Sequence, residues 1–166
     1  GTLVSFTEIT ETKLAEEAVR KSERLFSAVA DTSPALVWMS GTDKACHWFN
    51  KTWLAFTGRT MEQEYGNGWT QGLHPDDLDR CVGIYVEAFD KREPFSMRYR
   101  LRRSDGDYRV IEDVGSPRYD TDGAFLGYIG SCLDVTDRLA LESSLAASEA
   151  KVRELERRLS EYGEGR

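Results

Sequence analysis

The residues best suited to chemistry in this sequence are its two histidines and the acids beside them. His74 is followed by a proline and then by Asp76 and Asp77, a grouping that could bind a metal ion or exchange protons. The same residues are also typical of a helix start, because the positive end of the helix dipole favours acids. His47 lies beside Cys46 and has no second ligand at the spacing of a zinc site. The sequence therefore predicts no catalytic residue and no metal site.

The cysteines do not indicate a disulfide framework. Cys46, Cys81 and Cys132 are odd in number, widely separated and without a Cys-x-x-Cys pair, so we expect reduced thiols in a core. The net charge of −7 argues against nucleic acid as a partner. No apolar run reaches the roughly 20 residues that span a bilayer, and no signal peptide is recognisable. These features predict a cytoplasmic chain without a membrane segment.

Periodic residues in the second half of the chain predict antiparallel strands. Met97, Tyr99 and Leu101 alternate with arginines, which is typical of a strand with one buried face. Asp-Gly pairs at 105–106 and 122–123 predict turns, since glycine tolerates the positive φ of a tight turn. A hairpin over 35–49 brings the number of predicted strands to five. Of the other three strands, the first is predicted to start at 95, the second to cover 108–114 and the third to cover 125–133. A loop at 116–123 should precede the third strand.

Helices should cover this sheet and extend from it. The segment 11–30 lacks Pro and Gly and is rich in helix formers, whereas 2–10 has the composition of a short strand. Asn50 can cap a short helix that ends at Gly58, and 75–91 should form the longest helix inside the domain. Its apolar face, with Tyr85 and Phe89, should pack on the sheet.

The last segment, 135–166, is predicted to be a coiled-coil helix. Apolar residues alternate at spacings of three and four, which is a heptad pattern. Such a seam predicts a homodimer through the terminal helices, and its members are Leu141, Leu145, Val152, Leu155 and Leu159. Asp134 is the expected N-cap of this helix. Asp134 and Thr136 stand where the last strand becomes the helix, so we interpret them as the junction through which the sheet controls the helix.

An internal echo supports a modular organisation. A shift of 126 residues places Glu8 to Glu11 on Asp134 to Asp137, and it aligns the apolar positions of 15–29 with those of the C-terminal seam. We therefore predict that residues 1–10 end a preceding module, 11–30 form a linker helix, 31–134 form one complete domain and 135–166 form its output helix.

The order of several motifs resembles one known family. The words SPALVWMS, GNGWTQGLHPDD and GAFLGYIGSCLDVTD are similar to those of PAS domains with a PAC segment, over about 25–137. The resemblance implies an α+β fold with a five-stranded antiparallel sheet of order 2-1-5-4-3 and helices enclosing a pocket on one face. It also implies a bacterial multi-PAS signalling protein, such as a sensor histidine kinase or a diguanylate cyclase, with adjacent PAS and output domains as partners.

The resemblance also suggests a ligand pocket and limits its cofactors. The implied lining is Trp38, Trp53, Phe56, Tyr85, Phe89, Tyr99, Leu101, Ile111, Tyr128 and Cys132. Light-sensing flavin domains form a covalent adduct with a Cys after Gly58, where this chain has Arg59, and haem-binding members use a His on the helix that here covers 75–91, which has none. Both cofactors are therefore disfavoured, whereas a non-covalent flavin or another small metabolite stays open.

Three functions follow as hypotheses. The first is a sensory and dimerisation module that passes a signal to its output through a coiled coil, including the variant of a flavin or haem redox sensor. The second is a structural spacer that dimerises without a ligand. The third, a small α+β enzyme, requires the histidines and aspartates to converge in one cleft.

Overall fold

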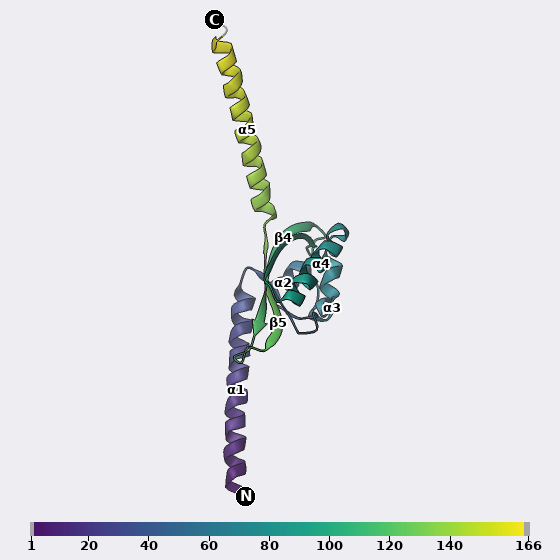
Figure 1. The fold of residues 1–166 in the computed structure, drawn as a ribbon, viewed down its shortest axis with the longest axis vertical. Coiled ribbons are helices and arrows are strands. Elements are labelled where there is room, and N and C mark those ends of the chain that lie inside the picture. Colours follow the sequence, from purple (N-terminus) through teal and green to yellow (C-terminus); the bar gives the residue numbers. More distant parts are fainter. Residues whose placement is uncertain (1, 165–166) are drawn as a thin grey trace.

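A five-stranded antiparallel sheet lies at the centre of the fold (Figure 1). The structure is a computed structural model that describes residues 2–164, with side chains described over 5–163. The strand order is β2-β1-β5-β4-β3, which confirms the expected topology. The strands are β1 (Leu36–Ser40), β2 (Cys46–Phe49), β3 (Phe95–Arg102), β4 (Tyr108–Tyr119) and β5 (Phe125–Asp134).

The register of the β3–β4 hairpin decides which side chains enter the core. Tyr99 lies opposite Ile111, and both are buried on the same face. The turn between the strands contains Gly106 at a φ of 95°, a backbone conformation that favours glycine. Along β3 the residues alternate between buried and more exposed, as the arginine alternation predicts.

The loop predicted at 116–123 is partly wrong, because β4 continues through Pro117 to Tyr119. Pairing of β4 with β3 ends at Gly115, whereas pairing with β5 continues to the end of the strand. Proline lacks a backbone N–H and is tolerated where one side of a strand has no partner. Because β3 does not extend as far as Pro117, that side of β4 has no partner strand there. A proline is tolerated at this position, although it would not fit in a strand paired on both sides.

Helices cover one face of the sheet (Figure 1). They are α2 (Lys51–Thr57), α3 (Met61–Glu64), the 3-10 helix η1 (Gly68–Gly72) and α4 (Pro75–Lys91). On α4, Tyr85 and Phe89 are buried, while Leu78 and Val82 are partly buried against the same core. The predicted apolar face of this helix is therefore confirmed.

Asn50 joins three elements at the entrance to the helical layer. Its Oδ1 accepts the N–H groups of Val37 and Trp53, at 2.9 and 3.0 Å, so it caps α2 as predicted. Its Nδ2 donates to the carbonyl oxygens of Ala30 and Ala35, at 2.7 and 2.9 Å. Because Asn50 is fully buried, these four bonds fix where the N-terminal helix meets the domain.

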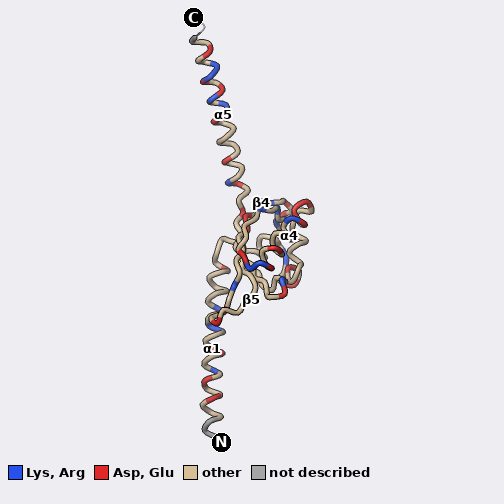
Figure 2. The backbone as a smooth tube through the Cα atoms, in the orientation of Figure 1, with Lys and Arg blue, Asp and Glu red and all other residues tan. Residues whose placement is uncertain are grey.

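The terminal helices leave the domain in opposite directions (Figure 1). Helix α1 covers Thr2–Thr32, so the strand expected over 2–10 is wrong and the helix is continuous. Its last turns lie beside the sheet face opposite α4, where Phe26 contacts Trp48 at a ring distance of 5.4 Å. Helix α5 covers Thr136–Glu164, and Figure 2 shows charged residues of both signs along both helices.

Candidate functional site

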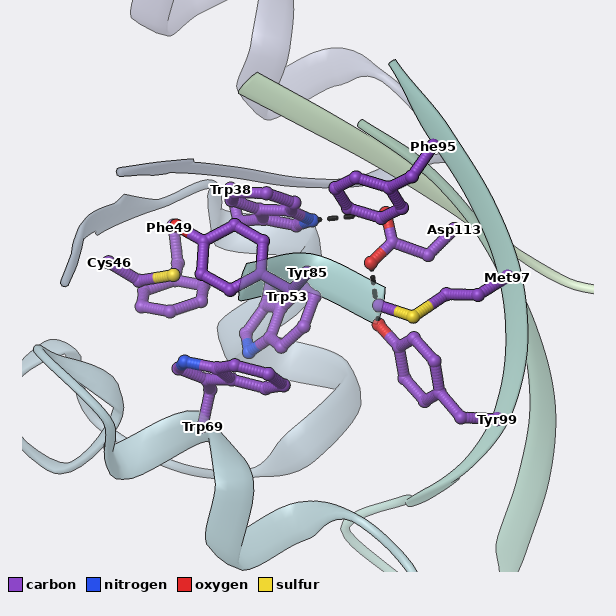
Figure 3. A pocket seen from close by; sticks show the side chains of 10 residues that line it. All are labelled: Trp38, Cys46, Phe49, Trp53, Trp69, Tyr85, Phe95, Met97, Tyr99 and Asp113. Atoms are coloured by element: carbon purple, nitrogen blue, oxygen red, sulfur yellow. Dashed lines mark hydrogen bonds between the residues drawn. The ribbon is translucent and has the colours of Figure 1, made fainter. Parts of the chain in front are cut away.

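A carboxyl group lies inside the domain, on β4, which pairs with strands on both sides. Asp113 is only 2% exposed. Trp38 Nε1 donates to its Oδ1 and the Tyr99 hydroxyl donates to its Oδ2, each at 3.1 Å (Figure 3). The Tyr99 oxygen also lies 3.7 Å from Cys132 Sγ. In the described part of the chain no Lys or Arg pairs with Asp113, so its charge is stabilised by neutral donors alone.

Burial changes the protonation of this cluster. It raises the pKa of Asp113 to about 6, against the opposing effect of hydrogen bonds from Cys132, Trp38 and Tyr99. Burial also raises the pKa of Tyr99 and of Cys132 well above their ordinary values. Asp113 is therefore the one member of the cluster that changes charge close to neutral pH.

Two facing glycines make room for the rings above Asp113. Gly115 of β4 lies opposite Gly130 of β5. A Cβ atom on Gly130 would lie 2.1 Å from the Trp38 ring, and one on Gly115 would lie 2.3 Å from the Phe95 ring. The two rings stack with centroids 6.2 Å apart and planes 19° apart. Only glycine at both positions lets these aromatic side chains lie flat on the sheet.

Ten side chains enclose a cavity between the sheet and the helices (Figure 3). They are Trp38, Cys46, Phe49, Trp53, Trp69, Tyr85, Phe95, Met97, Tyr99 and Asp113. The space open to the centre of a water molecule inside this cavity has a volume of about 10 Å³, so the cavity has room for about one water. Seven of the ten side chains are aromatic, so the interior is a nearly filled aromatic cage with one acid.

This arrangement does not fit a flavin or a haem. Pockets for ligands of that size have volumes of roughly 300–1,000 Å³, far above the space present here. Among the described residues, no histidine that could bind haem iron lines the cavity. At the end of α2, Gly58 is followed by Arg59 and not by a cysteine that could form a flavin adduct. The residues around the cavity thus accommodate neither cofactor without a rearrangement of the aromatic side chains.

The structure brings four of the ten predicted pocket residues to the cavity: Trp38, Trp53, Tyr85 and Tyr99. The other six contribute to the surrounding core instead. Phe89, Leu101, Ile111, Tyr128 and Cys132 are buried, and Phe56 is partly buried against the same cluster.

Six lining residues were missed by sequence reasoning: Cys46, Phe49, Trp69, Phe95, Met97 and Asp113. For β3 the signal was available, because Phe95 and Met97 share the alternation of Tyr99. Asp113 follows Ile111 by two residues and therefore faces the same side, but an acid in such a position is usually solvent-exposed. Trp69 lies on η1, where no periodicity places a side chain.

The His74 motif joins helix α4 to strand β3. Asp77 accepts from Arg100 Nε and Nη2 at 2.9 and 3.0 Å, and also from the Arg100 backbone N–H at 2.9 Å. The His74 N–H donates to the Arg100 carbonyl at 2.9 Å, and His74 Nδ1 accepts the N–H of Asp76 as the cap of α4. These contacts explain the motif as a structural connection.

The other candidate chemical groups lie elsewhere. His47 Nε2 is 3.1 Å from Asp43 Oδ2 and its ring stacks on Tyr65. Burial raises the pKa of Cys46 and raises that of Cys81 to about 11, so both thiols are protonated at neutral pH. Across residues 2–164 no three His, Cys, Asp or Glu side chains are grouped to hold a metal ion.

A dense set of contacts joins the end of β5 to the start of α5. Helix α5 begins at Thr136, so the prediction that Asp134 is its N-cap is wrong, and Asp134 is instead the last residue of β5. Asp134 Oδ1 still accepts the Thr136 N–H at 3.0 Å. Thr136 Oγ1 accepts the Val110 N–H of β4 at 2.7 Å, and the Val135 N–H donates to the Val110 carbonyl at 2.9 Å.

Charged side chains reinforce this junction. Arg109 donates to Asp134 Oδ2 at 2.7 Å and to Asp137 Oδ1 at 2.9 Å. Although burial raises the pKa of Asp134, hydrogen bonds from Arg109 and Thr136 bring it below its ordinary value. The two predicted junction residues are thus held to β4 by both backbone and ionic contacts.

The terminal helices expose apolar side chains. Leu141 and Leu159 are each 71% exposed, and the other predicted seam residues, Leu145, Val152 and Leu155, are 61, 50 and 48% exposed. On α1, Val19 and Val29 are exposed as well. Among the helices of the described residues, none is long and apolar enough to cross a membrane.

Comparison with known proteins agrees with this architecture. The family model described as PAS fold matches residues 47–132, which is slightly more than half of the chain. The uncharacterized protein y4lL of Sinorhizobium fredii is 38% identical over 141 residues, covering 85% of this chain and 17% of that protein. The peroxide stress-activated histidine kinase mak1 of Schizosaccharomyces pombe is 23% identical over 174 residues, covering 95% of this chain and 11% of the kinase. The chain thus spans less than a fifth of either relative.

A solved structure shows the same fold. The sensory box histidine kinase/response regulator from Burkholderia thailandensis superposes with a TM-score of 0.54 at 24% identity, over 79% of this chain and 97% of that one. The strand order, the helices on one face and the family match agree with one another. The chain belongs to the PAS-fold family.

Proposed function

We propose that this chain is the sensory and dimerisation module of a sensor histidine kinase, which relays a conformational state of its sheet to an output domain through α5. The observation that carries the proposal is the double connection of β4 to α5, through Thr136 and through Arg109. Because Asp113 lies on β4, three residues beyond Val110, a change in the cage acts on the strand that holds the helix.

Dimerisation supplies the second half of the relay. Each apolar side chain of the α5 seam that becomes buried stabilises an assembly by about 1.5–3 kcal/mol. A second copy of the chain has the same seam and offers the simplest partner. Movement of the two helices relative to each other then carries the signal, with a coupling free energy of about 1–3 kcal/mol.

The relatives favour a kinase as the parent protein. The mak1 protein is named as a histidine kinase, and the Burkholderia protein as a sensory box histidine kinase. Peroxide sensing by thiols is not part of the proposal, because burial raises the pKa of all three cysteines and thus lowers the thiolate fraction that reacts with peroxides.

Two experiments test the proposal. In the full-length parent, Asp134→Ala should uncouple phosphorylation from the stimulus while the domain still folds. Unchanged regulation in that variant contradicts the relay. For dimerisation, sedimentation of this chain should show a dimer that is lost in Leu145→Lys, with the exposed Ala147→Lys as a control outside the seam. A monomer at high concentration contradicts that part.

A second candidate is a structural spacer that dimerises without a ligand, and the small volume of the cavity favours it. Native mass spectrometry of freshly purified protein separates the two. A chain of bare mass whose stability no small molecule changes supports the spacer, whereas a retained metabolite supports the sensor.

A further inference from the structure

A surface groove lies beside the cage and shares two of its lining side chains. The groove runs between the turn at 43–45, η1 and α4, and both Trp69 and Tyr85 line the groove as well as the cavity. Movement of either ring would therefore join the interior to solvent. On α4 the groove is open beside Gly83, where an added Cβ would meet no atom within 4 Å.

The two shared rings differ in how they are held. The Tyr85 hydroxyl donates to the Lys44 carbonyl at 3.0 Å, and the Tyr85 ring contacts Trp38, Phe89 and Phe95. Trp69 Nε1 is buried and has no hydrogen-bond partner among the described residues, and its ring contact is with Tyr85 at 6.4 Å. Outward rotation of Trp69 thus breaks no hydrogen bond of its side chain, whereas displacement of Tyr85 breaks one.

Charge along this route has one predominant sign. Among the described residues, the groove is lined by the acids Asp43, Asp79 and Glu87 and by a single base, Lys44, whose ammonium pairs with Asp90 at 2.6 Å. At the inner end lies Asp113, with no basic partner in the same part of the chain. A negative groove leading to an unpaired carboxyl attracts cations and repels anions.

The rings of the cage present faces suited to a cation. Tyr85 is perpendicular to Trp38 and to Trp69, with an interplanar angle of 85° in both pairs, while Phe95 stacks almost parallel to Trp38. Ring faces therefore surround the cavity from different directions. Aromatic faces carry negative electrostatic potential and bind quaternary ammonium groups in desolvated sites.

We propose that the cage binds a small organic cation, such as a quaternary ammonium or amine, which enters through the groove by displacing the Trp69 ring and pairs with Asp113. The inference deepens the proposed sensory function and rests on it for its biological meaning. A cation pairs with the carboxyl that has no Lys or Arg beside it in the described chain, and it replaces the Trp69 ring in contact with the remaining aromatic faces.

The probe is choline, compared with its uncharged isostere in which a quaternary carbon replaces the nitrogen. Titration of the intact chain, followed by tryptophan fluorescence and calorimetry, should show saturable binding of choline at least about tenfold tighter than binding of the isostere. Equal affinity for the two molecules, or no binding of choline, overturns the proposal.

Two variants test separately the charge of Asp113 and the role of the Trp69 ring at the entrance to the cage. Asp113→Asn should remove the preference for choline, whereas Glu142→Gln, on exposed α5, should keep it. Trp69→Ala should accelerate choline association at least several-fold. An unchanged preference in Asp113→Asn, or an unchanged association rate in Trp69→Ala, contradicts the corresponding part of the proposal.

A pH titration provides an independent test if Asp113→Asn does not fold. Choline affinity of the unaltered chain should decrease on acidification through pH about 6, where Asp113 becomes neutral. The titratable groups that interact with Asp113 are Tyr99, Cys132, Cys46 and, on α4, Cys81, whose pKa values are all raised and which stay neutral in this range. A flat profile contradicts the role of Asp113. If choline does not bind but Asp134→Ala uncouples phosphorylation from the stimulus, only the cation site is refuted. If choline binds but Asp134→Ala leaves regulation unchanged, only the relay is refuted.

Discussion

Arg109 and Asp134 form an ion pair, Nε to Oδ2 at 2.7 Å, that connects β4 to the last residue of β5. The same guanidinium reaches Asp137 in the first turn of α5 at 2.9 Å. Both Arg109 and Asp134 are less than a quarter exposed, so solvent screens their pair less than it screens a surface ion pair. One side chain therefore holds the sheet and the output helix in a single arrangement.

Loss of this side chain should loosen the root of the helix. Arg109→Ala removes the bond to Asp134, which contributes about 1.5–3 kcal/mol, and the bond to Asp137, which contributes at most about 1 kcal/mol because the Asp137 side chain is 82% exposed. Hydrogen exchange of the amides in 136–142 should accelerate about tenfold or more, while amides of β3 stay protected. The exposed Arg102→Ala serves as the control, and equal exchange in both variants would show that Arg109 does not hold the helix.

Protonation of Asp113 should affect stability in the direction opposite to ordinary acids. Its pKa rises from 3.8 to about 6 on folding, so the stabilising contribution is present below pH 4 and lost as pH rises through 6. The shift corresponds to about 2–3 kcal/mol of unfolding free energy. From pH 4 to pH 7, the unfolding free energy measured with urea should fall by this amount in the wild-type chain relative to Asp113→Asn, which has no carboxyl group to titrate at this position. Parallel pH profiles of the two proteins would contradict the assignment.

Asp77 should behave in the conventional way. Hydrogen bonds from Arg100 lower its pKa, so its stabilisation is present above pH about 4 and is lost as pH falls. Asp77→Asn should reduce the unfolding free energy at pH 7 by about 2 kcal/mol, since the fork with Arg100 loses its charge. Asp79→Asn, which changes an exposed acid on the same helix, is the matched control. Similar unfolding midpoints of both variants in urea would argue against the structural role of the motif.

The glycine pair on the sheet should tolerate no side chain. In Gly130→Ala the new Cβ lies 2.1 Å from the Trp38 ring, so the ring has to move and the Trp38–Asp113 hydrogen bond is strained. We expect a loss of about 1–3 kcal/mol in unfolding free energy and a shift in tryptophan emission. Gly163→Ala, where nothing lies within 4 Å, should leave both unchanged. Wild-type stability of Gly130→Ala would show that the ring has another position available.

The extent to which local pattern predicts this molecule differs between its parts. The arginine alternation of β3, the Asn50 cap and the span of α4 depend on neighbours in sequence, and each was predictable. The continuation of β4 through Pro117 was not, because it depends on where β3 ends.

The candidate site shows the same division. The resemblance to the family, which rests on motifs in the sequence, implied that aromatic residues of β1, α2, α4 and β3 meet inside the domain, and four of these residues line the cavity. The three-dimensional structure was needed to place Asp113 among them, to show that Trp69 of η1 closes the cage and to show that β5 ends at Asp134. Those facts arise from contacts between segments far apart in the chain, where the partner and not the residue's own neighbours sets its environment.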